Sequence, residues 1–78
     1  MYRVTRKQLI TDGTAAEAKV VRFEDSRVVQ TIENAVTLQH SIRNDELALG
    51  GQPYGPSKVI FESPTFYRSV TVTIEEIS

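Results

Sequence analysis

The clearest alternation of apolar and polar residues lies near the C-terminal end of the chain. Val70, Val72 and Ile74 fall on one side of an extended segment, and the other side carries Ser69, Thr71, Thr73 and Glu75. This pattern predicts a strand over residues 66–77 with one buried face. We expect so long a strand to pair beyond its own neighbour, in a central sheet position or across a dimer, because a long exposed edge invites aggregation.

Four further segments are rich in β-branched and aromatic residues, which favour strands. They cover residues 2–11, 19–24, 28–32 and 57–62. The second and third are separated by Glu24–Arg27, a run of four polar residues typical of a turn. Residues 19–32 are therefore predicted to form a β-hairpin.

Two segments are predicted to interrupt the strands. After a turn at Asp12 and Gly13, Thr14 and Glu17 have the spacing of a capping box, which predicts a short helical turn. The segment 50–56 contains three glycines and two prolines. Such a composition disfavours both helix and strand ladder and predicts a loop.

Residues 35–49 fit two patterns, and the fold class depends on them. An alternating pattern predicts a half-buried strand whose apolar side would carry Val36, Leu38, His40 and Ile42. A helical stripe competes with it and would comprise Ala35, Leu38, Ile42 and Leu49. Asn34 is an acceptable N-cap for such a helix, and Gly50 is suited to end it. We favour the strand, because several polar residues of this segment are poor helix formers and Asn44–Asp45 would make a good turn.

The chain is therefore predicted to be a single domain, residues 1–78, with a mostly β fold: a small antiparallel sheet or barrel of five to six strands. The alternative is an α+β fold with one helix in residues 35–49 packed on a four-stranded antiparallel sheet. A core of this size contributes only a few kcal/mol, and the chain has no cysteine for disulfides or thiolate zinc sites. Self-association is the remaining support, so we expect a homo-oligomer.

Composition and charge describe an ordinary folded protein. Apolar residues make up 40% of the chain and the formal net charge is −1. Residues 1–22 carry five basic and two acidic side chains, whereas residues 23–50 carry two basic and five acidic ones. This asymmetry fits either complementary surfaces on neighbouring subunits or a mixed solvated exterior. With no apolar run of about 18 residues and no signal-peptide pattern, we expect a soluble, cytoplasmic protein with no membrane contact.

The residue types needed for catalysis are scarce. His40 is the single histidine, and adjacent carboxylates such as Asp45 and Glu46 would point to opposite sides of a strand. Gly50 and Gly55 have the spacing of a phosphate-binding loop, but two residues separate the second glycine from the following lysine. We therefore predict that the chain is not an enzyme and has no catalytic residue, no cofactor and no metal site.

The function predicted from this inventory is a small protein–protein interaction module, an inhibitor or accessory subunit that binds a larger protein partner. Tyr54 lies on a stiff loop, where an aromatic side chain offers contact area at small entropic cost. The candidate partner-binding residues are Tyr54, Gln52, Lys58, Arg3, Arg6 and Lys7. One alternative is a β-barrel that binds single-stranded nucleic acid, although a pI near 5.7 is low for that class. The other is a structural component of a virion or another assembly; no motif places the chain in a known family.

Overall fold

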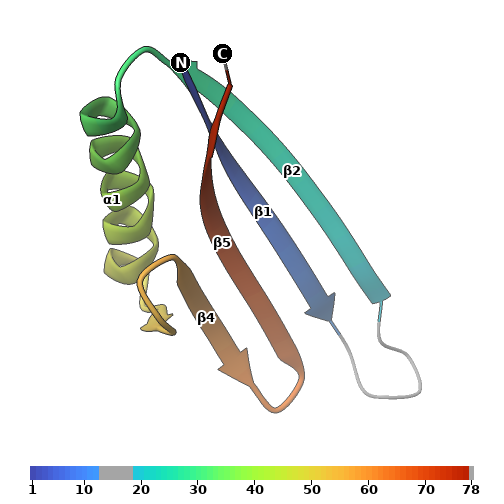
Figure 1. Ribbon diagram of the computed structural model, residues 1–78. Helices are drawn as coiled ribbons and strands as arrows, with labels where there is room; N and C mark the ends of the chain where they lie inside the picture. The colour runs from blue at the N-terminus through green and yellow to red at the C-terminus, as the bar shows by residue number, and fades with distance from the viewer. Residues whose placement is uncertain (13–18, 78) are drawn as a thin grey trace.

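The computed structural model describes residues 1–12 and 19–77 as one open sheet with a single helix on one face (Figure 1). Its elements are β1 (Tyr2–Asp12), β2 (Lys19–Val29), α1 (Ile32–Ala48), β3 (Gln52–Pro53), β4 (Lys58–Ser63) and β5 (Phe66–Glu76). All strand pairs are antiparallel, and the strand order is β2-β1-β5-β4-β3. The mostly β, antiparallel fold is confirmed. Among the described strands β2 and β3 lie at opposite edges, so the sheet is open and the barrel form is not adopted.

Three strands agree closely with their sequence patterns. The predicted strands 2–11, 57–62 and 66–77 correspond to β1, β4 and β5. β5 pairs with β1 on one side and with β4 on the other, as its length required. Val70 and Val72 are buried on the face of β5 that carries the core, whereas on the other face Ser69 is buried and Thr73 is exposed. The period of two in the sequence therefore identified the buried face of this central strand.

The predicted hairpin over residues 19–32 is wrong. Residues 19–29 form one continuous strand, and each of the eleven residues of β2 lies opposite a residue of β1. The polar run predicted to turn lies within this ladder, with Glu24 opposite Lys7 and Asp25 opposite Arg6. Polar residues are tolerated there because β2 is an edge strand that is exposed to solvent at nearly every position.

The strand favoured for residues 35–49 is also wrong, and the helical alternative is correct for this segment. α1 begins after Thr31, whose Oγ1 accepts a hydrogen bond from the backbone N–H of Asn34 at 3.1 Å. Thr31, and not Asn34, is therefore the N-cap. Gly50 follows the helix with φ of 102°, the left-handed conformation expected of a helix-ending glycine. The sheet beneath the helix has five strands, one more than the alternative predicted.

The glycine- and proline-rich segment is a loop with one short departure from the prediction. Gln52 and Pro53 form the two-residue strand β3, which pairs with Ile60 and Val59 of β4. A proline is tolerated there because β3 is an edge strand. The turn predicted at Gly13 and the capping box at residues 14–17 lie outside the described residues.

The core lies between α1 and one face of the sheet, nearer the end of the sheet where β1 begins. Its buried members are Val4, Ala35, Val70 and Val72, and the half-buried residues packed against them are Tyr2, Val29, Leu38, Ile42 and Ile74. The molecule is elongated, measuring 45 × 22 × 16 Å. The far end of β1 and β2 extends past the helix (Figure 1), so α1 covers only part of its face of the sheet.

A hydrogen-bonded ion pair fixes the C-terminal half of α1 to the sheet. Arg68 of β5 donates from Nη1 to Glu46 Oε2 at 2.7 Å and from Nη2 to Glu46 Oε1 at 3.2 Å. Arg68 also donates to Gln8 Oε1 of β1, and its guanidinium lies 5.0 Å from the centre of the Phe61 ring. One side chain therefore connects α1 with β1, β4 and β5.

Candidate interaction surface

The six residues predicted to contact a partner do not form one surface. Tyr54, Gln52 and Lys58 lie at the corner formed by β3, β4 and their connecting loop. Arg3 and Lys7 lie on the face of β1 that points away from α1. Side chains alternate between the two faces of a strand, and Val4, next to Arg3, belongs to the core beneath the helix. The remaining residue, Arg6, lies on the helix side of β1, so the predicted set falls into three groups.

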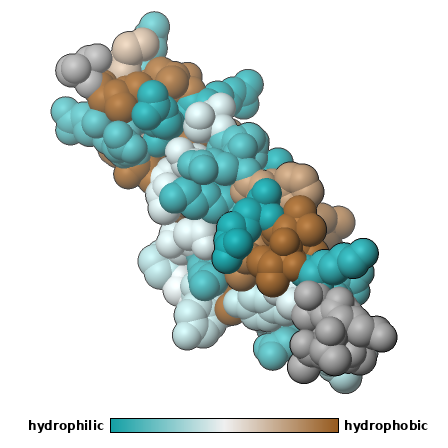
Figure 2. Space-filling model, turned by 90° about the vertical axis from the view of Figure 1, so that its right-hand side faces the viewer, coloured by the Kyte–Doolittle hydropathy of each residue, from teal (hydrophilic) through white to brown (hydrophobic). Residues whose placement is uncertain are grey.

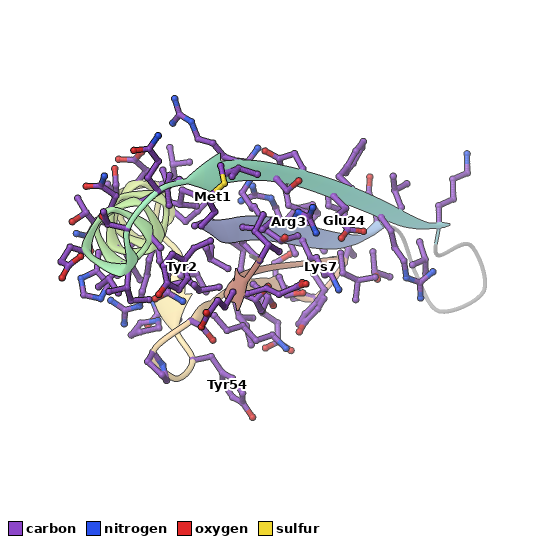
Figure 3. The ribbon with its side chains drawn as sticks, turned by 45° about the horizontal axis from the view of Figure 1, so that its top comes forward. Met1, Tyr2, Arg3, Lys7, Glu24 and Tyr54 are labelled. Atoms are coloured by element: carbon purple, nitrogen blue, oxygen red, sulfur yellow. The ribbon has the colours of Figure 1, made fainter. Side chains whose placement is uncertain are left out.

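The corner presents Tyr54 to solvent. Its side chain is 64% exposed and projects away from the rest of the molecule (Figure 3). The loop holds it in place: the backbone N–H of Tyr54 donates to the carbonyl of Lys58 at 2.9 Å, and Lys58 Nζ lies 5.6 Å from the centre of the ring. A shallow surface pocket beside it is lined by Gln52, Pro53, Tyr54, Ile60 and Glu62. The structure thus brings three of the predicted contact residues together around an aromatic side chain.

The basic residues of β1 each have an acidic cross-strand neighbour. Arg6 Nε lies 3.1 Å from Asp25 Oδ1. On the opposite face Lys7 lies across from Glu24, and in Figure 3 both side chains are seen over the sheet. Arg3 likewise lies across from Glu75 of β5. Since directly opposed charges of opposite sign interact favourably, the basic N-terminal segment is largely balanced by its neighbours and does not make a continuous basic surface.

The sequence patterns missed the exposed apolar side chains of β2. Ten of its eleven residues are exposed. They include four large apolar side chains that are 43–53% exposed, namely Val20, Val21, Phe23 and Val28. Figure 2, which shows the molecule from the side where β2 lies, has apolar surface next to the grey residues at the far end. The signal for this strand was the β-branched residues on both sides of the polar run. They were interpreted as two short strands, whereas they belong to one long strand.

The backbone of β2 is also available for pairing. In the described part of the chain β2 contacts a single strand, β1, because the strand order places it at an edge of the sheet. In an antiparallel ladder successive residues direct their N–H and C=O groups to alternate sides. Half of these groups in β2 therefore face away from β1. An exposed edge of this length with apolar side chains is a template on which another strand can add.

A small groove runs between β2 and the helix. Its walls include Val4, Leu38 and Ile42, and charged side chains at its rim come from Arg6, Asp25 and Arg27. The groove places exposed charges of both signs next to the edge of the core. This part of β2 therefore carries both apolar and charged side chains.

Residues 1–12 and 19–77 include the histidine of the chain and most of its carboxylates. His40 is exposed on α1, which differs from the position on an apolar strand face expected from the alternation. In these ranges no group of three histidine, aspartate or glutamate side chains is placed to hold a metal ion. No helix within them is both long enough and apolar enough to cross a membrane.

Comparison of the chain with protein-family models, with curated proteins and with solved structures finds no match. What the protein does must therefore be inferred from its own surface.

Proposed function

We propose that this protein is a non-enzymatic interaction module that self-associates and binds a larger protein partner, as an inhibitor or an accessory subunit. The observation that carries the proposal is β2, an eleven-residue edge strand with ten exposed positions and several exposed apolar side chains. Leaving such a strand in water exposes both apolar surface and hydrogen-bonding groups. Pairing with another chain would satisfy both at once.

The corner at Tyr54 supports the second part of the proposal. A tyrosine that is held by its own backbone hydrogen bond and by Lys58 loses little conformational freedom when it is bound. It lies at the opposite edge of the sheet from β2. Self-association through β2 would therefore leave the corner free to contact a partner.

The choice of binding over catalysis rests on the residue inventory. The chain contains one histidine and no cysteine, so nucleophilic and histidine-relay mechanisms have few candidate residues. The buried ion pair of Arg68 and Glu46 has a structural explanation, because it joins α1 to the sheet. We therefore assign the activity of the protein to its surfaces.

Sedimentation velocity over a dilution series tests the self-association. The wild-type chain should sediment as an oligomer at micromolar concentration, and Phe23→Lys should shift it towards the monomer because a charge replaces an exposed apolar side chain of β2. Thr37→Lys is the matched control, since Thr37 is exposed on α1. A wild-type chain that is monomeric at every concentration would contradict this part of the proposal.

Binding to a larger partner is tested by affinity capture from the native host with the wild-type chain and with Tyr54→Ala as baits. We expect a specific protein to be retained by the wild type and to be lost or weakened with the variant. Single-stranded DNA provides the competing assay. Tight binding to it that falls steeply with salt would favour the nucleic-acid alternative and contradict the proposal.

A further inference from the structure

We propose that the self-association partner is a second copy of this chain, paired antiparallel through β2 around a two-fold axis that passes beside Ser26. The two five-stranded sheets then become one continuous sheet of ten strands. The inference rests on the proposed function, because it specifies the surface and register of the oligomer proposed above. It is argued from the order of side chains along β2.

The two-fold symmetry restricts the possible registers. When antiparallel neighbours are related by an axis perpendicular to the sheet, the residue at the axis lies opposite its own copy, and paired residues lie on the same face. In β2 the odd-numbered residues lie on the helix side, since Phe23 lies opposite Gln8, which in turn lies opposite the core residue Val70. Glu24, Ser26 and Val28 lie on the other face. Each candidate register is therefore defined by the one residue at its centre.

The register centred on Ser26 pairs complementary side chains on the helix side of the sheet, and on the other face it places Ser26 opposite its own copy and Glu24 opposite Val28. It places Asp25 opposite Arg27 of the second copy, and this pair occurs twice because of the symmetry. It also places Phe23 opposite Val29 of the second copy, again twice. Opposite charges and aromatic–aliphatic pairs in directly opposed positions stabilise the pairing of two strands. No two like charges of β2 are opposed in this register.

Four other registers, centred on residues 22–25, are less favourable. Centring the pair on Arg22, Glu24 or Asp25 places a charged residue opposite its own copy. Centring it on Phe23 opposes Lys19 to Arg27 at both ends of the pairing. Directly opposed like charges are destabilising. Charge complementarity therefore selects Ser26 among these centres.

The register centred on Ser26 also extends the core. Val29 is the one residue of β2 that is partly buried, and it packs against the core cluster between the sheet and α1. Phe23 of the second copy would lie beside Val29 and cover it. Asp25, which already accepts a hydrogen bond from Arg6, would lie between two guanidinium groups. The contact thus continues packing and charge pairing that exist within one chain.

Cysteine scanning measures this register directly, because the chain has no cysteine of its own. Ser26→Cys places two thiols opposite each other, where Cβ atoms are about 4.5–5.5 Å apart, close to disulfide geometry. Glu24→Cys is the matched control on the same face, and in this register its two copies are offset by four residues, or about 13 Å. With copper phenanthroline as oxidant, we expect Ser26→Cys to form a disulfide dimer at least tenfold faster than Glu24→Cys.

Charge reversal gives a second measurement that needs no cysteine. Arg27→Glu should weaken the dimer at least tenfold in sedimentation equilibrium, because the introduced carboxylate would oppose Asp25 of the second copy. Arg22→Glu should have a smaller effect, since Arg22 would lie opposite Gln30 just beyond the strand. Far-UV circular dichroism of both variants checks that the fold is retained.

The outcomes separate this inference from the broader proposal. Equal or faster cross-linking of Glu24→Cys, or a larger effect of Arg22→Glu than of Arg27→Glu, would overturn the Ser26 register. If the wild-type chain still sedimented as an oligomer, self-association would survive that result. A wild-type chain that remained monomeric would overturn both.

Discussion

The ion pair between Arg68 and Glu46 should couple the helix to the sheet by a measurable free energy. The perturbation is a double-mutant cycle with Glu46→Gln, Arg68→Met and the two combined. Two nitrogen–oxygen contacts join the side chains at 2.7 and 3.2 Å, and the side chains are 7% and 19% exposed for glutamate and arginine. The pair is thus much more buried than the pair of Arg6 and Asp25, whose side chains are 35% and 63% exposed.

The expected magnitude follows from this burial. Removing one partner of a buried pair costs about 3–5 kcal/mol, because the other charge is left unpaired. Arg68 is partly solvated and retains its hydrogen bonds to Gln8, which lowers the expected cost. We therefore expect Glu46→Gln to reduce the free energy of unfolding by about 2–3 kcal/mol. The double variant should lose less than the sum of the single variants, by about 1.5 kcal/mol or more, since neither charge is then left alone.

Urea unfolding at 25 °C, followed by far-UV circular dichroism, measures all four free energies. The slope of each transition should stay constant, so that shifts in the midpoint report stability. Asp45→Asn is the matched control, because Asp45 is the adjacent carboxylate and is exposed. It should change the free energy by less than about 0.5 kcal/mol. A coupling energy below about 0.5 kcal/mol, within the range of solvent-exposed ion pairs, would refute the reasoning.

Three further predictions concern the corner and the helix. Gly51→Ala should destabilise the fold by about 1–3 kcal/mol in urea unfolding, since the added Cβ would clash with Val59 Cγ1 and Phe61 Cζ; an unchanged midpoint would contradict this close packing. Thr31→Ala should cost about 1 kcal/mol by loss of the N-cap, whereas Thr31→Ser should cost much less, and equal losses would argue against the hydroxyl contact. Tyr54→Ala should leave the melting temperature within about 2 °C of wild type while it weakens capture of the partner; unchanged capture by the folded variant would exclude Tyr54 as an anchor.

The two incorrect segment predictions share one cause, which is that polar residues were interpreted locally. Within residues 35–49, Asn44 and Asp45 were interpreted as a turn after a strand, yet both lie within α1, and the next residue, Glu46, is buried and paired with Arg68, 22 positions further along the chain. Within residues 19–32 the polar run was taken for a turn, yet it continues a ladder with β1. In both segments the partner that stabilises the polar residue is distant in sequence, so no local pattern contains it.

The candidate surface could be predicted only in part, because residues that are close in sequence do not always share a surface. Tyr54, Gln52 and Lys58 are close in sequence, and the loop brings them together. Arg3, Arg6 and Lys7 are also close in sequence, but a strand sends alternate side chains to opposite faces, which separates Arg6 from the other two. The exposure of β2 followed from its place at the edge of the sheet, and strand order is not encoded in a period of two.

By itself the sequence determined the strands whose burial alternates strongly, together with the loop rich in glycine and proline. Val70, Val72 and Ile74 lie together on one face of an extended chain. Their period of two was therefore enough to predict the strand β5 from the local sequence. Tertiary structure decided the helix, the continuity of β2 and its exposure. Residues 32–48 and 19–29 have weak or mixed local preferences, and their conformation is chosen by the sheet they pack on or pair with.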